Sequence, residues 1–248
     1  MSWDKFSEIY RWEFDFLNPN QNKDIDFWID TAKQYGGEIL DIASGDGRIT
    51  LPLIDAGFNL TAIDLSQKMI EKLNSLNSSH LDAKVADMRT FELNKKFDLI
   101  IVSYFSFQQL LTLNDQILCL NQIRKHLSPD GVLGIDIYPC VCEGNDKKKM
   151  QKIYSKEMGE NIIEMHSSHN IDRLNLIKTW NDKYYIYDKN HRIKDNFSNK
   201  IALKECSPNY MELLFKTTGF KIIKSFGSFD KKPVTPSSQN IIYLLKSN

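Results

Sequence analysis

Short apolar runs alternate with amphipathic segments from Glu38 to Tyr138. Five runs have the length and the continuous hydrophobicity of strands buried in a parallel sheet: Glu38–Ile42, Leu60–Asp64, Ala83–Ala86, Phe97–Ser103 and Val132–Tyr138. Segments between them place apolar residues at helical spacing: Ile49–Ala56, Ser66–Leu76 and Leu113–Leu127. This alternation predicts right-handed βαβ units, with helices covering both faces of one parallel sheet.

The pattern changes on either side of this region. Residues 3–35 carry unevenly spaced aromatic residues and predict one or two helices, with a break at Asn18–Asn20 and a further helix over Asp24–Tyr35. Residues 144–206 predict a Lys-rich helix followed by antiparallel strands, because polar and apolar residues alternate there. The chain then returns to a helix over Pro208–Thr218 and ends with two strands: Phe220–Lys224 and Asn240–Leu245. Ser128–Gly131 predicts a turn.

Composition limits the partners that we expect. Hydrophobic residues make up 42% of the 248-residue chain, and 32 Lys and Arg residues balance 32 Asp and Glu residues. Without a positive excess, we expect no nucleic-acid partner. No run approaches the roughly 20 apolar residues of a membrane span, so we expect no membrane partner and a cytoplasmic location. The four scattered cysteines predict reduced thiols and no metal site.

The segment Asp41–Gly47, with the sequence DIASGDG, lies between a buried strand and a helix. Glycines there permit positive φ and let a ligand approach the backbone closely, and nucleotides bind at the carboxyl ends of parallel strands. The motif by itself is also compatible with a plain tight turn. The dinucleotide fingerprint needs a small residue where Thr50 stands.

Two more acidic residues end the next two strands. Asp64 follows Gly47 by 17 residues, near the spacing at which an acidic side chain accepts hydrogen bonds from ribose hydroxyls. Asp87 is placed to accept a hydrogen bond from the exocyclic amine of adenine, with Leu65 and Met88 on either side of the ring. Each aspartate alone is equally compatible with a helix cap, whereas three at successive strand ends favour a nucleoside site.

These motifs together resemble the class I S-adenosylmethionine-dependent methyltransferases, in particular their small-molecule branch. The resemblance rests on Leu40–Gly47, Asp64, Ala86–Met88, Phe97–Ser103 and Leu127–Gly134. It implies S-adenosyl-L-methionine as cofactor, with Asp41 and Gly45 at its methionine end, and an enzyme that methylates a small-molecule acceptor. The expected cofactor-binding residues are Asp41, Ala43, Ser44, Gly45, Gly47, Asp64, Leu65, Ser66, Met69, Ala86, Asp87, Met88, Ser103 and Tyr104.

The resemblance places the acceptor near Ser103–Gln109. Related enzymes carry histidine or asparagine near Gln108 or Gln109, and a glutamine amide orients an acceptor without removing its proton. We therefore expect Gln108 and Gln109 to contribute to catalysis by orientation, with a nitrogen or an oxygen nucleophile. Tyr10 matches an N-terminal tyrosine that closes over the cofactor, although it also suits simple packing. A non-catalytic S-adenosylmethionine-binding or regulatory protein, and a nicotinamide nucleotide-binding protein, remain alternatives.

The sequence thus predicts an α/β fold with a doubly wound, mostly parallel seven-stranded sheet, a C-terminal antiparallel hairpin and an inserted antiparallel lid. Residues 1–143 would hold the N-terminal helices and the cofactor-binding core, and residues 207–248 would complete the core sheet. Residues 144–206 would form the lid, or a platform for substrate or for a homodimer. His126, at a helix end, is expected to cap that helix or to be solvated.

Overall fold

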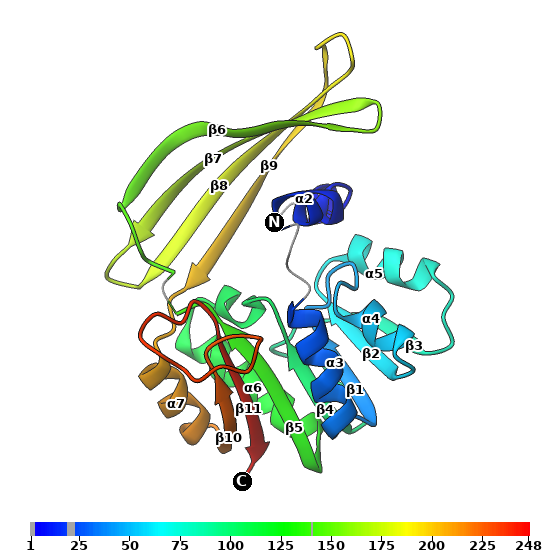
Figure 1. Ribbon diagram of the computed structural model, residues 1–248, viewed down its shortest axis with the longest axis vertical. Helices are drawn as coiled ribbons and strands as arrows, with labels where there is room; N and C mark the ends of the chain where they lie inside the picture. Colours follow the sequence, from blue (N-terminus) through cyan, green and yellow to red (C-terminus); the bar gives the residue numbers. More distant parts are fainter. Residues whose placement is uncertain (1–2, 19–22, 140) are drawn as a thin grey trace. The chain divides into compact units, whose positions relative to one another are not determined.

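The computed structural model describes residues 3–18, 23–139 and 141–248, which form two compact units (Figure 1). We call residues 23–139 with 206–248 the core unit, and residues 3–18 with 141–205 the insert unit. The helices within residues 3–18 therefore group with the inserted segment, whereas the helix over Asp24–Tyr35 groups with the core. Of the predicted break at Asn18–Asn20, all but Asn18 lies outside the described residues.

The core unit is built on a seven-stranded sheet in the order β10-β11-β5-β4-β1-β2-β3 (Figure 1). Its strands are β1 (Glu38–Ile42), β2 (Asn59–Asp64), β3 (Leu81–Val85), β4 (Phe97–Val102), β5 (Leu127–Ile137), β10 (Phe220–Phe226) and β11 (Ile241–Ser247). The pairings among the strands β1 to β5 are all parallel. The strand β11 runs antiparallel to both of its neighbours, β10 and β5. The predicted α/β fold with a reversed C-terminal hairpin is confirmed.

Helices cover both faces of this sheet because successive strand residues point to opposite sides. In β4, Leu99 and Ile101 pack with Trp28 and Leu53, whereas Ile100 and Val102 join a second cluster. The helices are α3 (Lys23–Tyr35), α4 (Thr50–Asp55), α5 (Gln67–Ser75), α6 (Leu113–His126) and α7 (Pro208–Thr217), with a short 3₁₀ helix η1 (Ser106–Gln109). Each fully buried Leu, Ile or Val side chain contributes roughly 1.5–3 kcal/mol.

The insert unit combines two short helices with a four-stranded antiparallel sheet in the order β6-β7-β8-β9. Its elements are α1 (Trp3–Phe6), α2 (Tyr10–Leu17), β6 (Lys147–Met158), β7 (Asn161–Asp172), β8 (Ile177–Tyr187) and β9 (Ile193–Lys204). Phe6 and Ile9 pack against Tyr154, Ile163 and Tyr184. These contacts are the physical reason why the N-terminal helices group with this sheet.

Two local predictions were wrong. Residues 147–158 form a strand, not a Lys-rich helix, because β6 pairs with β7 along most of its length. Ser128–Gly131, predicted as a turn, lies inside β5, where the register with β4 shifts between Phe97 and Leu99. Within residues 3–18, 23–139 and 141–248, no helix is long and apolar enough to cross a membrane.

Candidate functional site

Four neighbouring parallel strands bring most of the sequence-predicted site residues to one edge of the core sheet. The strands β4, β1, β2 and β3 lie side by side, so their carboxyl ends share that edge. Asp41–Gly47 includes the end of β1 and the turn after it, Asp64–Ser66 begins with the last residue of β2, and Ala86–Met88 and Ser103–Tyr104 directly follow β3 and β4. We call this the carboxyl edge, and it has the location where open α/β sheets bind ligands.

The turn after β1 adopts backbone conformations that favour glycine. Ala43, Gly45 and Gly47 have φ angles of 57°, 56° and 88°. A Cβ on Gly47 would lie 2.6 Å from Leu73 Cδ2, so this glycine is also needed for packing against α5. The Gly45 N–H donates to Asp64 Oδ2 over 2.9 Å, which fixes the turn against the end of β2.

Asp64 supports two backbone segments at once. Its Oδ2 accepts from Gly45, and its Oδ1 accepts from the Ser66 N–H over 2.8 Å. A carboxylate offers about four lone-pair positions, so acceptor capacity is left for the hydroxyls of a ribose. Burial raises the pKa of Asp64. The next side chain, Leu65, is 67% exposed, which leaves an apolar surface beside the carboxylate.

Asp41 is buried, and its Oδ2 accepts a 2.6 Å hydrogen bond from Thr50 Oγ1. Thr50 therefore orients the β1 acid, at the position where a dinucleotide fingerprint would need a small residue. Burial raises the pKa of Asp41 to about 7. Asp41 Oδ1 and Ser44 Oγ are buried without a hydrogen-bond partner among the described residues. Unsatisfied polar atoms at this turn fit a ligand with a cationic, polar end, as the expected cofactor has.

The structure gives Asp87 a protein partner. Arg89 binds both carboxylate oxygens of Asp87 and reaches Asp115 on α6 over 2.9 Å. The Arg89 guanidinium lowers the pKa of Asp87, which is consequently ionised at neutral pH. The predicted hydrogen bond from an adenine amine would have to share these oxygens.

The two candidate glutamines differ in their surroundings. Gln108 is fully buried; its Nε2 donates to the Tyr138 carbonyl over 3.0 Å, and its Oε1 accepts from the Tyr138 N–H over 2.7 Å. Both ends of its amide thus hold the backbone after β5, and its predicted role in orienting an acceptor stays a prediction. Gln109 is half-buried, and its amide has no bonded partner in the part of the chain that the structure describes.

The segment before these glutamines is held in an unusual conformation. Tyr104 and Phe105 have φ angles of 55° and 59°, a left-handed conformation that costs a residue with a Cβ roughly 1–2 kcal/mol. Asp136, near the end of β5, accepts from the Tyr104 N–H over 2.9 Å and from the Phe105 N–H over 3.3 Å. The Arg48 guanidinium lies 5.0 Å from the Tyr104 ring centroid.

The sequence prediction missed Asp136, Arg48 and Asp24. Arg48 forms an ion pair with Asp24 over 2.5 Å, and both side chains are less than one-tenth exposed. Asp136 is only 1% exposed, and burial raises its pKa to about 7. An acidic residue near the end of a predicted strand is the signal that identified Asp64, and it would have identified Asp136 as well.

The remaining predicted residues lie elsewhere. Met69 is buried in α5, where its N–H donates to Ser66 Oγ, so Ser66 is the N-cap of that helix. Tyr10 belongs to the insert unit, where its ring lies edge-on to Phe6 at 5.7 Å. Its expected contact with the cofactor stays a prediction. Cys119, Cys142 and Cys206 are buried free thiols.

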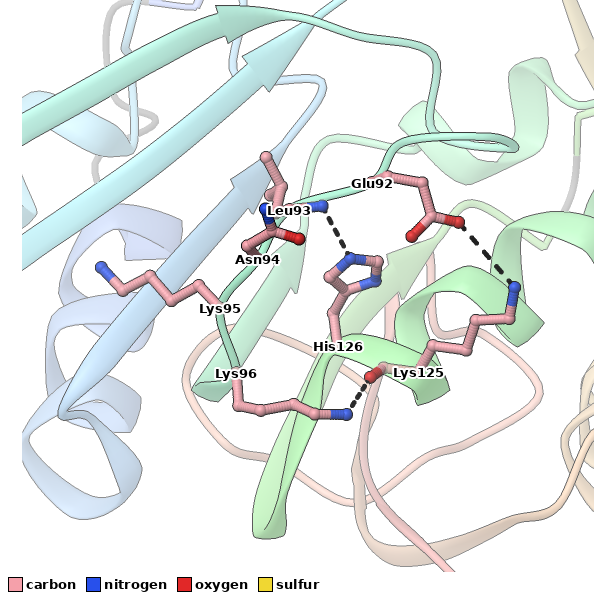
Figure 2. Close-up of a pocket in the computed structure, with 7 residues that line it drawn as sticks. All are labelled: Glu92, Leu93, Asn94, Lys95, Lys96, Lys125 and His126. Carbon is pink, nitrogen blue, oxygen red and sulfur yellow. Dashed lines mark hydrogen bonds and ion pairs between the residues drawn. The ribbon is translucent and has the colours of Figure 1, made fainter.

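A pocket of about 410 Å³ lies away from the carboxyl edge. It is lined by Glu92–Lys96 and Lys125–His126, which precede β4 and β5 and so mark the amino ends of these strands (Figure 2). His126 is buried: its Nε2 accepts from the Leu93 N–H over 3.0 Å, and its Nδ1 donates to the Gln122 carbonyl. The expectation of a solvated histidine was therefore wrong, whereas the bond to the Gln122 carbonyl near the C-terminus of α6 agrees with the expected capping role. This pocket is separate from the predicted site.

Comparisons with known proteins agree with this arrangement. Residues 39–131 match a family model described as a methyltransferase domain. The "Putative methyltransferase YqeM" of Bacillus subtilis (strain 168) is 33% identical over 45% of this chain, and the match spans 46% of that relative. A glycine/sarcosine N-methyltransferase of Aphanothece halophytica is 24% identical over 92% of this chain and 81% of its own. The crystal structure of an S-adenosylmethionine-dependent methyltransferase from Clostridium acetobutylicum ATCC 824 superposes with a TM-score of 0.80 at 22% identity, and covers all of both chains.

Proposed function

We propose that this chain, which belongs to the S-adenosylmethionine-dependent methyltransferases, methylates a nitrogen atom of a small-molecule acceptor. The observation that carries the proposal is the composition of Ser103–Gln109, which contains hydroxyl and amide side chains but no carboxylate or imidazole. An unprotonated amine attacks without a general base, whereas a hydroxyl usually needs one. The likeness to a glycine/sarcosine N-methyltransferase along most of the chain supports this choice.

The carboxyl edge supplies the groups that would hold S-adenosylmethionine. Asp64 would accept from the two ribose hydroxyls, and Asp41 with the Gly45 turn would face the charged methionine end. Because Arg89 occupies the oxygens of Asp87, the adenine ring would depend mainly on the apolar surfaces of Leu65 and Met88.

When bound, S-adenosylmethionine supplies an electrophilic methyl group on a positively charged sulfur. The protein's part is to place the acceptor nitrogen in line with that carbon and sulfur, since alignment accounts for much of the acceleration in such displacements. Gln109 would orient the acceptor through its half-buried amide. The left-handed turn at Tyr104 and Phe105 would set the direction in which this segment leaves β4.

The test begins with calorimetric titration of the purified protein with S-adenosylmethionine, its demethylated product and NAD. We expect S-adenosylmethionine and its demethylated product to bind and NAD not to bind. Binding of NAD without binding of the other two would contradict the cofactor assignment. Transfer of a labelled methyl group is then followed with glycine, sarcosine, an amino sugar and their hydroxyl analogues. Methylation of the amines is expected; methylation confined to the hydroxyl compounds would refute the choice of nitrogen.

A pair of variants tests the role of Gln109. Gln109→Ala should lower kcat/KM for the amine by about 10-fold, the effect of one neutral hydrogen bond of about 1.4 kcal/mol. Gln67→Ala is the matched control, because Gln67 lies on α5 and, among the described residues, its side chain bonds Glu71 on the same helix. Equal kcat/KM values for both variants and the wild type would remove Gln109 from the mechanism.

A further inference from the structure

The end of β4 is shaped by a carboxylate from the neighbouring strand. Val102, the last residue of β4, pairs with Ile135 of β5, so Asp136 lies beside the residues that leave β4. Its two oxygens accept from two successive backbone N–H groups, those of Tyr104 and Phe105. Both of these residues have positive φ, a conformation that residues with a Cβ rarely adopt without a specific partner.

The surroundings of Asp136 make it an effective anchor. It is 1% exposed, so bulk water does not compete for its hydrogen bonds. Asp24 from α3 and Arg48 from the turn before α4 are the charged groups that act on it, one raising and the other lowering its pKa. Arg48 also contacts the Tyr104 ring and binds Asp24, which links these charged groups to the same loop.

We propose that Asp136 is a positioning residue for methyl transfer, whose carboxylate holds Tyr104 and Phe105 in the left-handed conformation and so fixes Ser103–Gln109 against the acceptor. This inference rests on the proposed function. The mechanism requires the ionised form, because protonation turns one oxygen into a hydroxyl, which is a much weaker acceptor than a carboxylate oxygen for the N–H that faces it. The loop therefore tightens, and turnover rises, as Asp136 loses its proton.

This predicts a specific pH dependence. Burial places the pKa of Asp136 at about 7, so kcat should rise between about pH 6 and 8 with wild-type protein. Each titrating group gives its own rising limb in the plot of kcat against pH. The acceptor amine also loses a proton as pH rises, and the position of its limb depends on the amine that is chosen. Comparing two amines of different pKa separates the limb of the amine from the limb of the protein. The Asp136→Asn variant then separates Asp136 from Asp41, whose pKa is also about 7.

The Asp136→Asn variant keeps the shape of the side chain but turns one acceptor into a donor. We expect kcat to fall by about 10- to 100-fold, as for one lost hydrogen bond to a charged group, and the part of the limb near pH 7 that is due to Asp136 to disappear. The affinity for S-adenosylmethionine should fall less than kcat does, since Tyr104 is the one expected cofactor-binding residue whose N–H the carboxylate is seen to bind among the described residues. Adding Phe105→Gly should restore part of kcat, because glycine adopts positive φ without strain.

Asp98→Asn is the matched control. Asp98 also accepts from a backbone N–H, that of Glu38 over 3.0 Å, and from Ser128 Oγ over 2.7 Å, but it stands at the amino end of β4. Its loss should reduce stability without changing kcat or the pH profile. An equal loss of kcat in both variants would show a general effect of damaging the sheet and would overturn the proposal.

Hydrogen exchange gives a measurement that needs no acceptor. The Tyr104 and Phe105 amides should exchange slowly in the wild type and at least about 10-fold faster in Asp136→Asn at the same pH. Unchanged exchange, or faster exchange with unchanged kcat, would overturn the inference. If the wild type methylates no amine, the proposed function fails by itself, and the exchange result still decides whether Asp136 holds the loop.

Discussion

Replacing Asp64 by asparagine should separate the two tasks of this carboxylate. The native side chain accepts from the Gly45 and Ser66 N–H groups and keeps acceptor capacity for a ribose. In Asp64→Asn one oxygen becomes an NH₂ group, which faces one of these N–H donors and cannot accept from it. The glycine turn then loses an anchor, and the cofactor loses a charged acceptor.

The magnitude follows from the bonds that change. A hydrogen bond to a charged group contributes about 1.5–3 kcal/mol, and about 1.4 kcal/mol corresponds to a tenfold change in Kd. Loss of one such bond to the ribose predicts a Kd for S-adenosylmethionine about 10- to 100-fold higher. Because burial raises the pKa of Asp64, the measurement belongs at pH 8, where the wild-type carboxylate is more fully ionised.

Isothermal titration calorimetry measures this directly, with circular dichroism to confirm that the variant is folded. Asp82→Asn provides the control, because Asp82 lies on the adjacent strand β3, is exposed and, in the part of the chain that the structure describes, pairs with Lys84. It should change Kd by less than about twofold, as a surface ion pair contributes little. A folded Asp64→Asn protein that binds within threefold of the wild type would refute the assignment of Asp64 to the ribose.

Three further outcomes concern stability. Burial raises the pKa values of Asp41 and Asp136 to about 7. Between about pH 4 and 7 the folded state therefore binds more protons than the unfolded state, and the free energy of unfolding should fall as pH rises through this window. A free energy of unfolding that does not change with pH in urea titrations would contradict this. Gln108→Ala should lower the free energy of unfolding by about 2–4 kcal/mol through two lost buried hydrogen bonds, while the folded fraction binds the cofactor normally in calorimetry. Gly134→Ala should cost about 1–3 kcal/mol in thermal unfolding, because the new Cβ would lie 2.5 Å from Trp28 Cζ3; an unchanged melting temperature would show that the ring moves aside.

Much of the core unit could be predicted because its signals are local. Buried parallel strands appear in the sequence as apolar runs. Asp64, which ends β2, indicates the carboxyl edge from its place in the sequence alone. The strand β6 was not predicted, because lysine is depleted in strands and its first three residues are lysines. The strand forms by pairing with β7, and this pairing is not visible in the local sequence.

The sequence could not show which of the two glutamines binds the backbone, for a related reason. Gln108 and Gln109 are adjacent, and only the 3₁₀ helix η1 decides which of them turns toward Tyr138. Asp136, in contrast, could have been found by applying the strand-end argument to β5. Its partners could not, since positive φ at Tyr104 and Phe105 has no sequence signal in residues that carry a Cβ.

The position of β11 has a consequence for how the chain is synthesised. This last strand stands between β5 and β10, so β10, although made earlier, has no neighbour in the finished sheet until residues 241–247 leave the ribosome. Until then both β5 and β10 present unpaired edges, which are sites of association with other chains. Removal of these seven residues would leave both β5 and β10 without a paired neighbour on that side. A fusion partner attached after them would be tolerated only if β11 could still pair with both strands.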